Sequence, residues 1–187
     1  MLTEREFDEV RRKIVMAWHK GDVDGAFVEI EKVFEGEGTP DMKGECLFYR
    51  GMIRESGGDL TAARQDWTEG LQYAREGTFL RFQLEHNVGE SLEREGLPEE
   101  ALDWYKRSLK TCTDGHEYSG HQSLAAYLRL KGGKIEPGTE TLIASIIVRS
   151  WRVLELPGTP DLKDLLSTAT ELANVFSNRV EIIVRDT

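Results

Sequence analysis

Cysteine and proline are both scarce in this sequence. The 187 residues include two cysteines, Cys46 and Cys112, with no Cys-x-x-Cys pair and no matching histidine spacing. A disulfide framework or a metal site at these cysteines is therefore not expected, and both are interpreted as packed thiols in a reducing compartment. The five prolines lie between segments of helical periodicity and not within them.

Long apolar runs are missing as well. The N-terminal segment MLTEREFDEVRRK is charged and does not resemble a signal peptide. The longest apolar run near the C-terminus, residues 142–148, is interrupted by Ser145 and stays far below the ~20 residues that a membrane span requires. We therefore expect a cytoplasmic protein with no membrane association.

Positive charge is in deficit. The chain has 24 lysines and arginines against 34 aspartates and glutamates, which gives a formal net charge of −10. Nucleic-acid binding needs a clustered positive face, so no nucleic-acid partner is expected. A basic protein partner suits this charge, because complementary fields steer association. The same charge is explained equally well by solubility alone, and both readings stay open.

Recognisable catalytic and metal-binding patterns are also absent. None of the four histidines, His19, His86, His116 and His121, has a second ligand type at helical spacing in a known metal pattern. The sequence has no Gly-x-Ser-x-Gly nucleophile elbow, and its paired carboxylates are typical of solvated helix faces. We expect no catalytic residues, no metal and no cofactor, and therefore no enzyme activity.

The sequence is rich in amphipathic helix patterns. Apolar residues recur at i, i+3, i+4 and i+7, first from Phe7 to Trp18 and then from Val23 to Val33. Similar patterns continue along the chain, and a Gly-Thr dipeptide precedes several of them, as at residues 38–39 and 77–78. A threonine in that place caps a helix N-terminus. Short breaks at Gly21, Gly58 and Gly96 predict that successive helices fold back as antiparallel pairs.

These pairs repeat along the chain. The alanines Ala26, Ala63 and Ala101 are 37 and 38 residues apart, and the turn glycines follow the same steps. A period in this range is typical of stacked helical hairpins, in which each pair buries a face that it cannot bury alone.

One stretch carries a family resemblance. The segment NVGESLEREGLPEEALDWYKRSL, residues 87–109, resembles a tetratricopeptide repeat. The positions that match the family pattern are Val88, Gly89, Leu92, Gly96, Ala101 and Tyr105. The preceding unit matches less closely, at Leu47, Gly51, Gly58, Ala63 and Trp67. The first unit keeps Gly21 and Ala26 but has Ile14 where the family prefers glycine, and the step exceeds the family's ~34 residues.

The resemblance implies an all-α fold, a right-handed superhelical array of antiparallel helix pairs that forms one domain over residues 1–187. Its units are expected at about 5–35, 41–75 and 79–111, followed by a divergent pair at 116–155 and a capping helix at 160–177. Gly51 and Gly89 are expected at close approaches between paired helices, and Trp67 and Tyr105 between neighbouring pairs. The final VEIIVRDT is compatible with helix, strand or an extended tail.

In this family the first helix of each pair lines a concave binding surface. Carrying that register across gives a predicted partner-binding groove of thirteen residues: Arg11, Val15, Trp18, His19, Phe48, Tyr49, Met52, Glu55, Gln83, His86, Asn87, Glu90 and Arg94. Trp18 and Phe48 are explained equally well as core residues. One subclass of the family clamps the C-terminal carboxylate of chaperones. Only Arg11 and Asn87 resemble its clamp residues, so a helix or folded loop of another protein is the expected ligand.

Three functions fit this pattern. The first is a non-enzymatic protein-binding module, such as an adaptor, a secretion chaperone or a toxin-immunity protein. The second is a self-associating scaffold or homodimer, suggested by the apolar Ile146, Ile147 and Trp151. The third is a sensor that binds a peptide or a small molecule.

Overall fold

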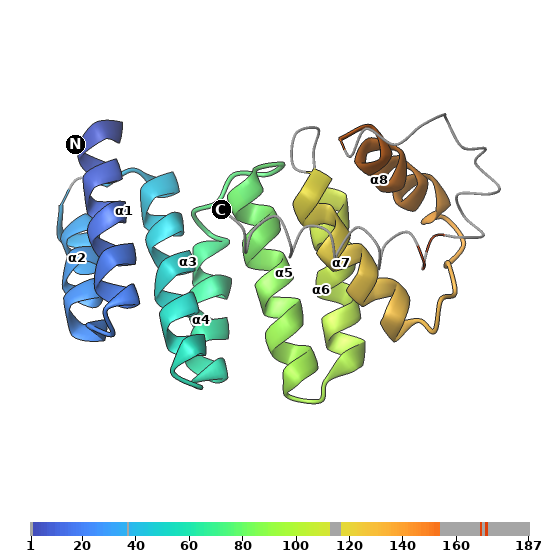
Figure 1. Ribbon diagram of the computed structural model, residues 1–187, viewed down its shortest axis with the longest axis horizontal. Helices are drawn as coiled ribbons and strands as arrows, with labels where there is room; N and C mark the ends of the chain where they lie inside the picture. The colour runs from blue at the N-terminus through green and yellow to red at the C-terminus, as the bar shows by residue number, and fades with distance from the viewer. Residues whose placement is uncertain (1, 37, 113–116, 154–168, 170, 172–187) are drawn as a thin grey trace. The chain divides into compact units, whose positions relative to one another are not determined.

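The computed structural model describes residues 2–36, 38–112, 117–153, 169 and 171. Over these ranges the chain forms eight α-helices and no strand, which confirms the all-α fold class. The helices are α1 Glu4–His19, α2 Val23–Glu35, α3 Pro40–Ser56, α4 Leu60–Gly70, α5 Phe79–Arg94, α6 Pro98–Thr111, α7 Glu117–Leu130 and α8 Glu140–Val153 (Figure 1). Contacts divide the chain into two compact units, Met1–Glu76 and Gly77–Thr187.

Threonine caps start the first helix of each of the first three pairs. Thr3 forms a capping box with Glu6, in which each side chain accepts the other residue's backbone N–H. The Thr39 hydroxyl accepts from the Met42 N–H at the start of α3. The Thr78 hydroxyl accepts from the Arg81 N–H at the start of α5. Both helix starts predicted from Gly-Thr are therefore confirmed. Each cap satisfies a backbone donor that the first turn of a helix leaves unpaired.

Unit 1 consists of α1 to α4. Helix α1 packs against α2, α3 packs against α4, and α1 and α3 lie side by side (Figure 1). One core cluster joins α1, α2 and α3, and its buried members are Phe7, Ile14, Ala26, Ile30, Val33, Met42, Cys46 and Ile53. Burial raises the pKa of the Cys46 thiol to about 12. The prediction that Cys46 and Cys112 are packed thiols is confirmed, because both are free and buried.

Two glycines mark close approaches within helix pairs. A Cβ atom on Gly51 would lie 2.6 Å from Cδ1 of Trp67, and one on Gly89 would lie 3.0 Å from the ring of Tyr105. The predicted close approaches are confirmed. The predicted place of the two rings was wrong: each ring packs against the glycine of its own pair, in the space where a Cβ atom would otherwise stand.

Unit 2 contains α5 to α8. Helix α5 packs against α6, α6 against α7, and α7 against α8. Ile146 and Ile147 are buried within the chain, with exposed fractions of 2% and 0%, so they offer no apolar surface for self-association. The Trp151 side chain and the final VEIIVRDT lie outside the described residues. So does the predicted capping helix 160–177, apart from Ala169 and Glu171, which are helical.

No helix within the described ranges combines the length and the hydropathy that a membrane crossing requires.

Candidate functional site

The first helices of unit 1 are joined by side chains on the predicted binding face. The Arg11 guanidinium of α1 forms an ion pair with Glu45 of α3 and also contacts Asp8. Trp18 Nε1 donates a hydrogen bond to the Ser56 hydroxyl oxygen at 3.1 Å. These two contacts fix α1 against α3 at the middle and at the C-terminal end of α1.

The aromatic residues of this face are partly core and partly surface. Trp18 and Tyr49 pack against the unit 1 core while remaining incompletely buried. The Phe48 and Tyr49 rings meet edge to face, with centroids 5.5 Å apart. Burial raises the pKa of Tyr49, and the neighbouring carboxylate of Glu45 adds to the effect. A half-buried phenol of this kind offers a partner both an apolar ring and a protonated hydroxyl.

The remaining predicted residues of unit 1 surround these aromatics. Val15, Met52 and Glu55 are partly buried, and His19 at the end of α1 is exposed, with its ring stacked on Trp18. The α1–α3 face, defined here as these eight predicted residues, therefore combines apolar groups with one acidic and two basic side chains.

In unit 2 the predicted residues come from α5, and the His86 side chain is largely buried. Its side chain is 13% exposed, its ring stacks on Phe82, and Nδ1 lies 2.8 Å from the Ser123 hydroxyl oxygen of α7. Burial lowers the pKa of His86 to about 4, so the ring is neutral at pH 7. His86 therefore joins α5 to α7. Gln83 and Asn87 are partly buried, whereas Glu90 and Arg94 are exposed.

Several residues at this site were not predicted from the sequence. Ser56 bonds Trp18 across 38 residues, Ser123 bonds His86 across 37, and Arg129 pairs with Glu93 across 36. These separations are close to the repeat step of 37 and 38 residues in the sequence. Searching for polar pairs at the repeat step would have found them, because equivalent positions on stacked units lie side by side.

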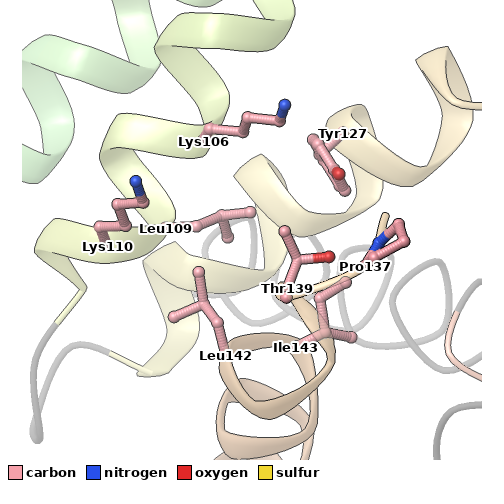
Figure 2. A pocket seen from close by; sticks show the side chains of 9 residues that line it. Lys106, Leu109, Lys110, Tyr127, Pro137, Thr139, Leu142 and Ile143 are labelled. Carbon is pink, nitrogen blue, oxygen red and sulfur yellow. The ribbon is translucent and has the colours of Figure 1, made fainter. Parts of the chain in front are cut away.

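A second candidate site is a cavity in unit 2 that the sequence did not reveal. It has a volume of about 210 Å³ and opens between α6, α7 and the start of α8 (Figure 2). Its lining residues are Lys106, Leu109, Lys110, Tyr127, Pro137, Gly138, Thr139, Leu142 and Ile143.

Charged groups hold the loop at the edge of this cavity. Lys106 and Lys131 both pair with Glu136, and their hydrogen bonds lower the pKa of that carboxyl to about 2. The Gly138 N–H donates to the Glu140 carboxylate at 2.6 Å, and the Thr139 hydroxyl donates to the Glu136 carbonyl oxygen at 2.7 Å. The loop is thus fixed by bonds to its own residues and to two lysines.

Among the described residues, no group of three histidine, cysteine, aspartate or glutamate side chains is arranged to hold a metal ion. Comparisons with protein-family models, with curated proteins and with solved structures found no match to this chain.

Proposed function

We propose that this chain is a non-enzymatic, tetratricopeptide-like module that binds another protein through the first helices of its pairs. The observation that carries the proposal is the set of bonds between like helices. Trp18 of α1 bonds Ser56 at the end of α3, and His86 of α5 bonds Ser123 of α7, at separations of 38 and 37 residues. Stacked helical hairpins would make contacts of this kind between equivalent helices, and the two bonds support the proposal in that way.

The chemistry of the α1–α3 face supports a protein ligand. Its half-buried aromatics Trp18, Phe48 and Tyr49 are residue types that dominate binding energy at protein interfaces. The chain has a net charge of −10, which favours a partner with a basic surface. An amphipathic helix or a folded loop with lysine or arginine beside apolar residues fits both properties.

The test compares partner capture by a face variant and by a matched control. Tyr49→Ala with Glu90→Lys changes one predicted contact in each unit. Thr68→Ala with Asp103→Lys makes a similar exchange at exposed positions of the second helices α4 and α6. Each tagged chain is used for affinity purification from host extract, followed by quantitative mass spectrometry and a binding measurement with the purified candidate.

We expect the face variant to lose a specific partner by at least tenfold in affinity, with unchanged helical circular dichroism. The control is expected to bind like the unmodified protein. Equal loss in both variants, or full retention by the face variant, would contradict the assignment of the binding face.

A further inference from the structure

The cavity between α6, α7 and α8 contains a buried hydrogen-bond donor. The Tyr127 side chain is 1% exposed, and its hydroxyl has no hydrogen-bond partner of acceptable geometry in the described part of the chain. Thr139 and the Glu136 carboxylate lie near the phenol, but neither meets its hydroxyl with the distance and angle of a hydrogen bond. In Figure 2 the Tyr127 hydroxyl points toward the side of the cavity formed by Thr139 and Pro137. A buried polar group without a partner is unfavourable, and an acceptor on a ligand would offset that cost.

The charge around the cavity selects an anion. Its lining includes two lysines and no carboxylate, although the whole chain has a net charge of −10. Lys106 is paired with Glu136, and its Nζ lies 6.0 Å from the centre of the Tyr127 ring. Lys110 is exposed and forms no ion pair with any of the described carboxylates. Because Glu136 offsets the charge of Lys106, the net positive charge at the cavity comes from Lys110, and the phenol supplies one neutral donor.

The remaining walls are apolar, which restricts the size and type of anion. Leu109, Leu142, Ile143 and Pro137 contribute apolar side chains to the lining (Figure 2). Phosphate and sulfate need several donors, usually backbone N–H groups or arginine. The Gly138 N–H is already engaged by Glu140, and arginine is absent from the lining. A carboxylate on a short hydrocarbon needs fewer donors and matches the apolar walls.

We propose that this cavity binds a small monocarboxylate with a short aliphatic or aromatic group. The carboxylate accepts from the Tyr127 hydroxyl and is attracted by Lys106 and Lys110, and the hydrocarbon packs on Leu109, Leu142 and Ile143. The volume of about 210 Å³ is below the ~300–1,000 Å³ of typical ligand pockets, so the hydrocarbon is short. This site is separate from the α1–α3 face, so the protein would bind a small molecule in addition to its protein partner.

The experiment is a titration of the full-length ¹⁵N-labelled chain with hexanoate, followed by two-dimensional NMR. Ligands of this size reach dissociation constants on the order of 0.1–10 mM. We expect saturable shifts concentrated at residues 106–110, 127 and 137–143. Hexanol, which keeps the hydrocarbon without the charge, is expected to bind at least tenfold more weakly, and hexylammonium is expected not to bind.

Variants then test the named donors. Tyr127→Phe removes only the buried hydroxyl and should weaken hexanoate binding at least fivefold, and Lys110→Met should weaken it about threefold. Lys20→Met, at an exposed lysine after α1, is the matched control and should leave binding unchanged.

The same spectra show whether each variant is folded. If Tyr127→Phe does not fold, the proposal is tested by Lys110→Met and by the comparison of hexanoate with hexanol and hexylammonium. The proposal is overturned by shifts that do not saturate, by equal binding of hexanoate and hexanol, or by unchanged affinity in a folded Tyr127→Phe. Those outcomes would leave partner capture by the first helices untouched.

Discussion

The indole ring of Trp67 occupies the space beside Gly51 in which a side chain would otherwise stand. A Cβ atom on Gly51 would approach Cδ1 and Cε2 of that ring to 2.6 and 2.7 Å. The indole N–H also donates to the Phe48 carbonyl oxygen at 3.2 Å, one turn earlier on the same helix as the glycine. This hydrogen bond fixes the ring, so α3 and α4 pack tightly only because residue 51 has no side chain.

Gly51→Ala should therefore destabilise unit 1. Overpacking costs ~1–3 kcal/mol, and the better helix propensity of alanine returns at most ~1 kcal/mol. Gly89→Ala should cost less, because the nearest Tyr105 atoms lie at 3.0 Å. The free energy of unfolding from urea titration checks the order. In a double-mutant cycle, Trp67→Phe should remove part of the Gly51→Ala cost, and strict additivity of the two changes would contradict the clash.

The turn between α3 and α4 contains two adjacent glycines with different requirements. Gly58 has a φ of +86° with open space around its Cα, whereas Gly57 has a φ of −81°. Gly58→Ala should cost about 1 kcal/mol, because a side chain is strained at positive φ. Gly57→Ala should be neutral or slightly stabilising, because its backbone is already helical. Thermal unfolding of the two single variants provides the comparison, and equal effects would refute the argument.

A buried carboxylate holds two arginines together in unit 1. The Asp66 side chain is 3% exposed, accepts from Arg50 Nε at 2.9 Å and lies 3.2 Å from Arg54 Nη1. Asp66→Ala should lower the free energy of unfolding by ~1–3 kcal/mol, since it removes the buried acceptor of Arg50 and Arg54, while Arg50 keeps its ion pairs with Glu31 and Glu69. Glu9→Ala removes the carboxylate from the exposed pair with Arg12 and should change stability by less than ~0.5 kcal/mol. A similar cost in both variants, measured by chemical denaturation, would show that burial of Asp66 is unimportant.

His86 should make unit 2 less stable in mild acid. Its pKa is lowered to about 4 by burial, below the ~6.5 of an unfolded chain, so the unfolded state binds the proton first. Stability is therefore complete near pH 7 and falls as the pH decreases from about 6.5 toward 4. The groups that face the ring are Tyr105, Glu93 and Glu90, whose carboxylate oxygen lies 3.8 Å from Nε2.

His86→Gln cannot take up this proton. Between pH 7 and pH 5, the unmodified protein should lose about 2 kcal/mol more than the variant, as measured by urea unfolding at each pH. Glu90→Gln serves as a control for the nearest carboxylate. Parallel pH profiles for the unmodified protein and His86→Gln would exclude the histidine as the cause.

Local features of the fold were predictable because they depend on a few consecutive residues. The capping threonines Thr39 and Thr78 satisfy donors within three residues of themselves. Gly58 takes its positive φ at the turn where the sequence placed a break. The step between equivalent positions was also predictable. It placed Gly51 and Gly89 at close approaches within their pairs, but it did not identify Trp67 and Tyr105 as the side chains that these glycines accommodate.

The candidate sites were less predictable, because burial depends on distant segments. Ile146 and Ile147 belong to an apolar stripe, and the sequence does not specify whether another helix or a second molecule covers it. In the structure both residues are buried within the chain. His86 fits a surface position in the repeat register, yet Phe82, Tyr105 and Ser123 enclose it. The sequence determined where helices begin, turn and repeat, since capping and turn energies are local. Only the tertiary structure decided which way Trp67 faces and that Tyr127 ends in a cavity, since both depend on side chains from separate helices.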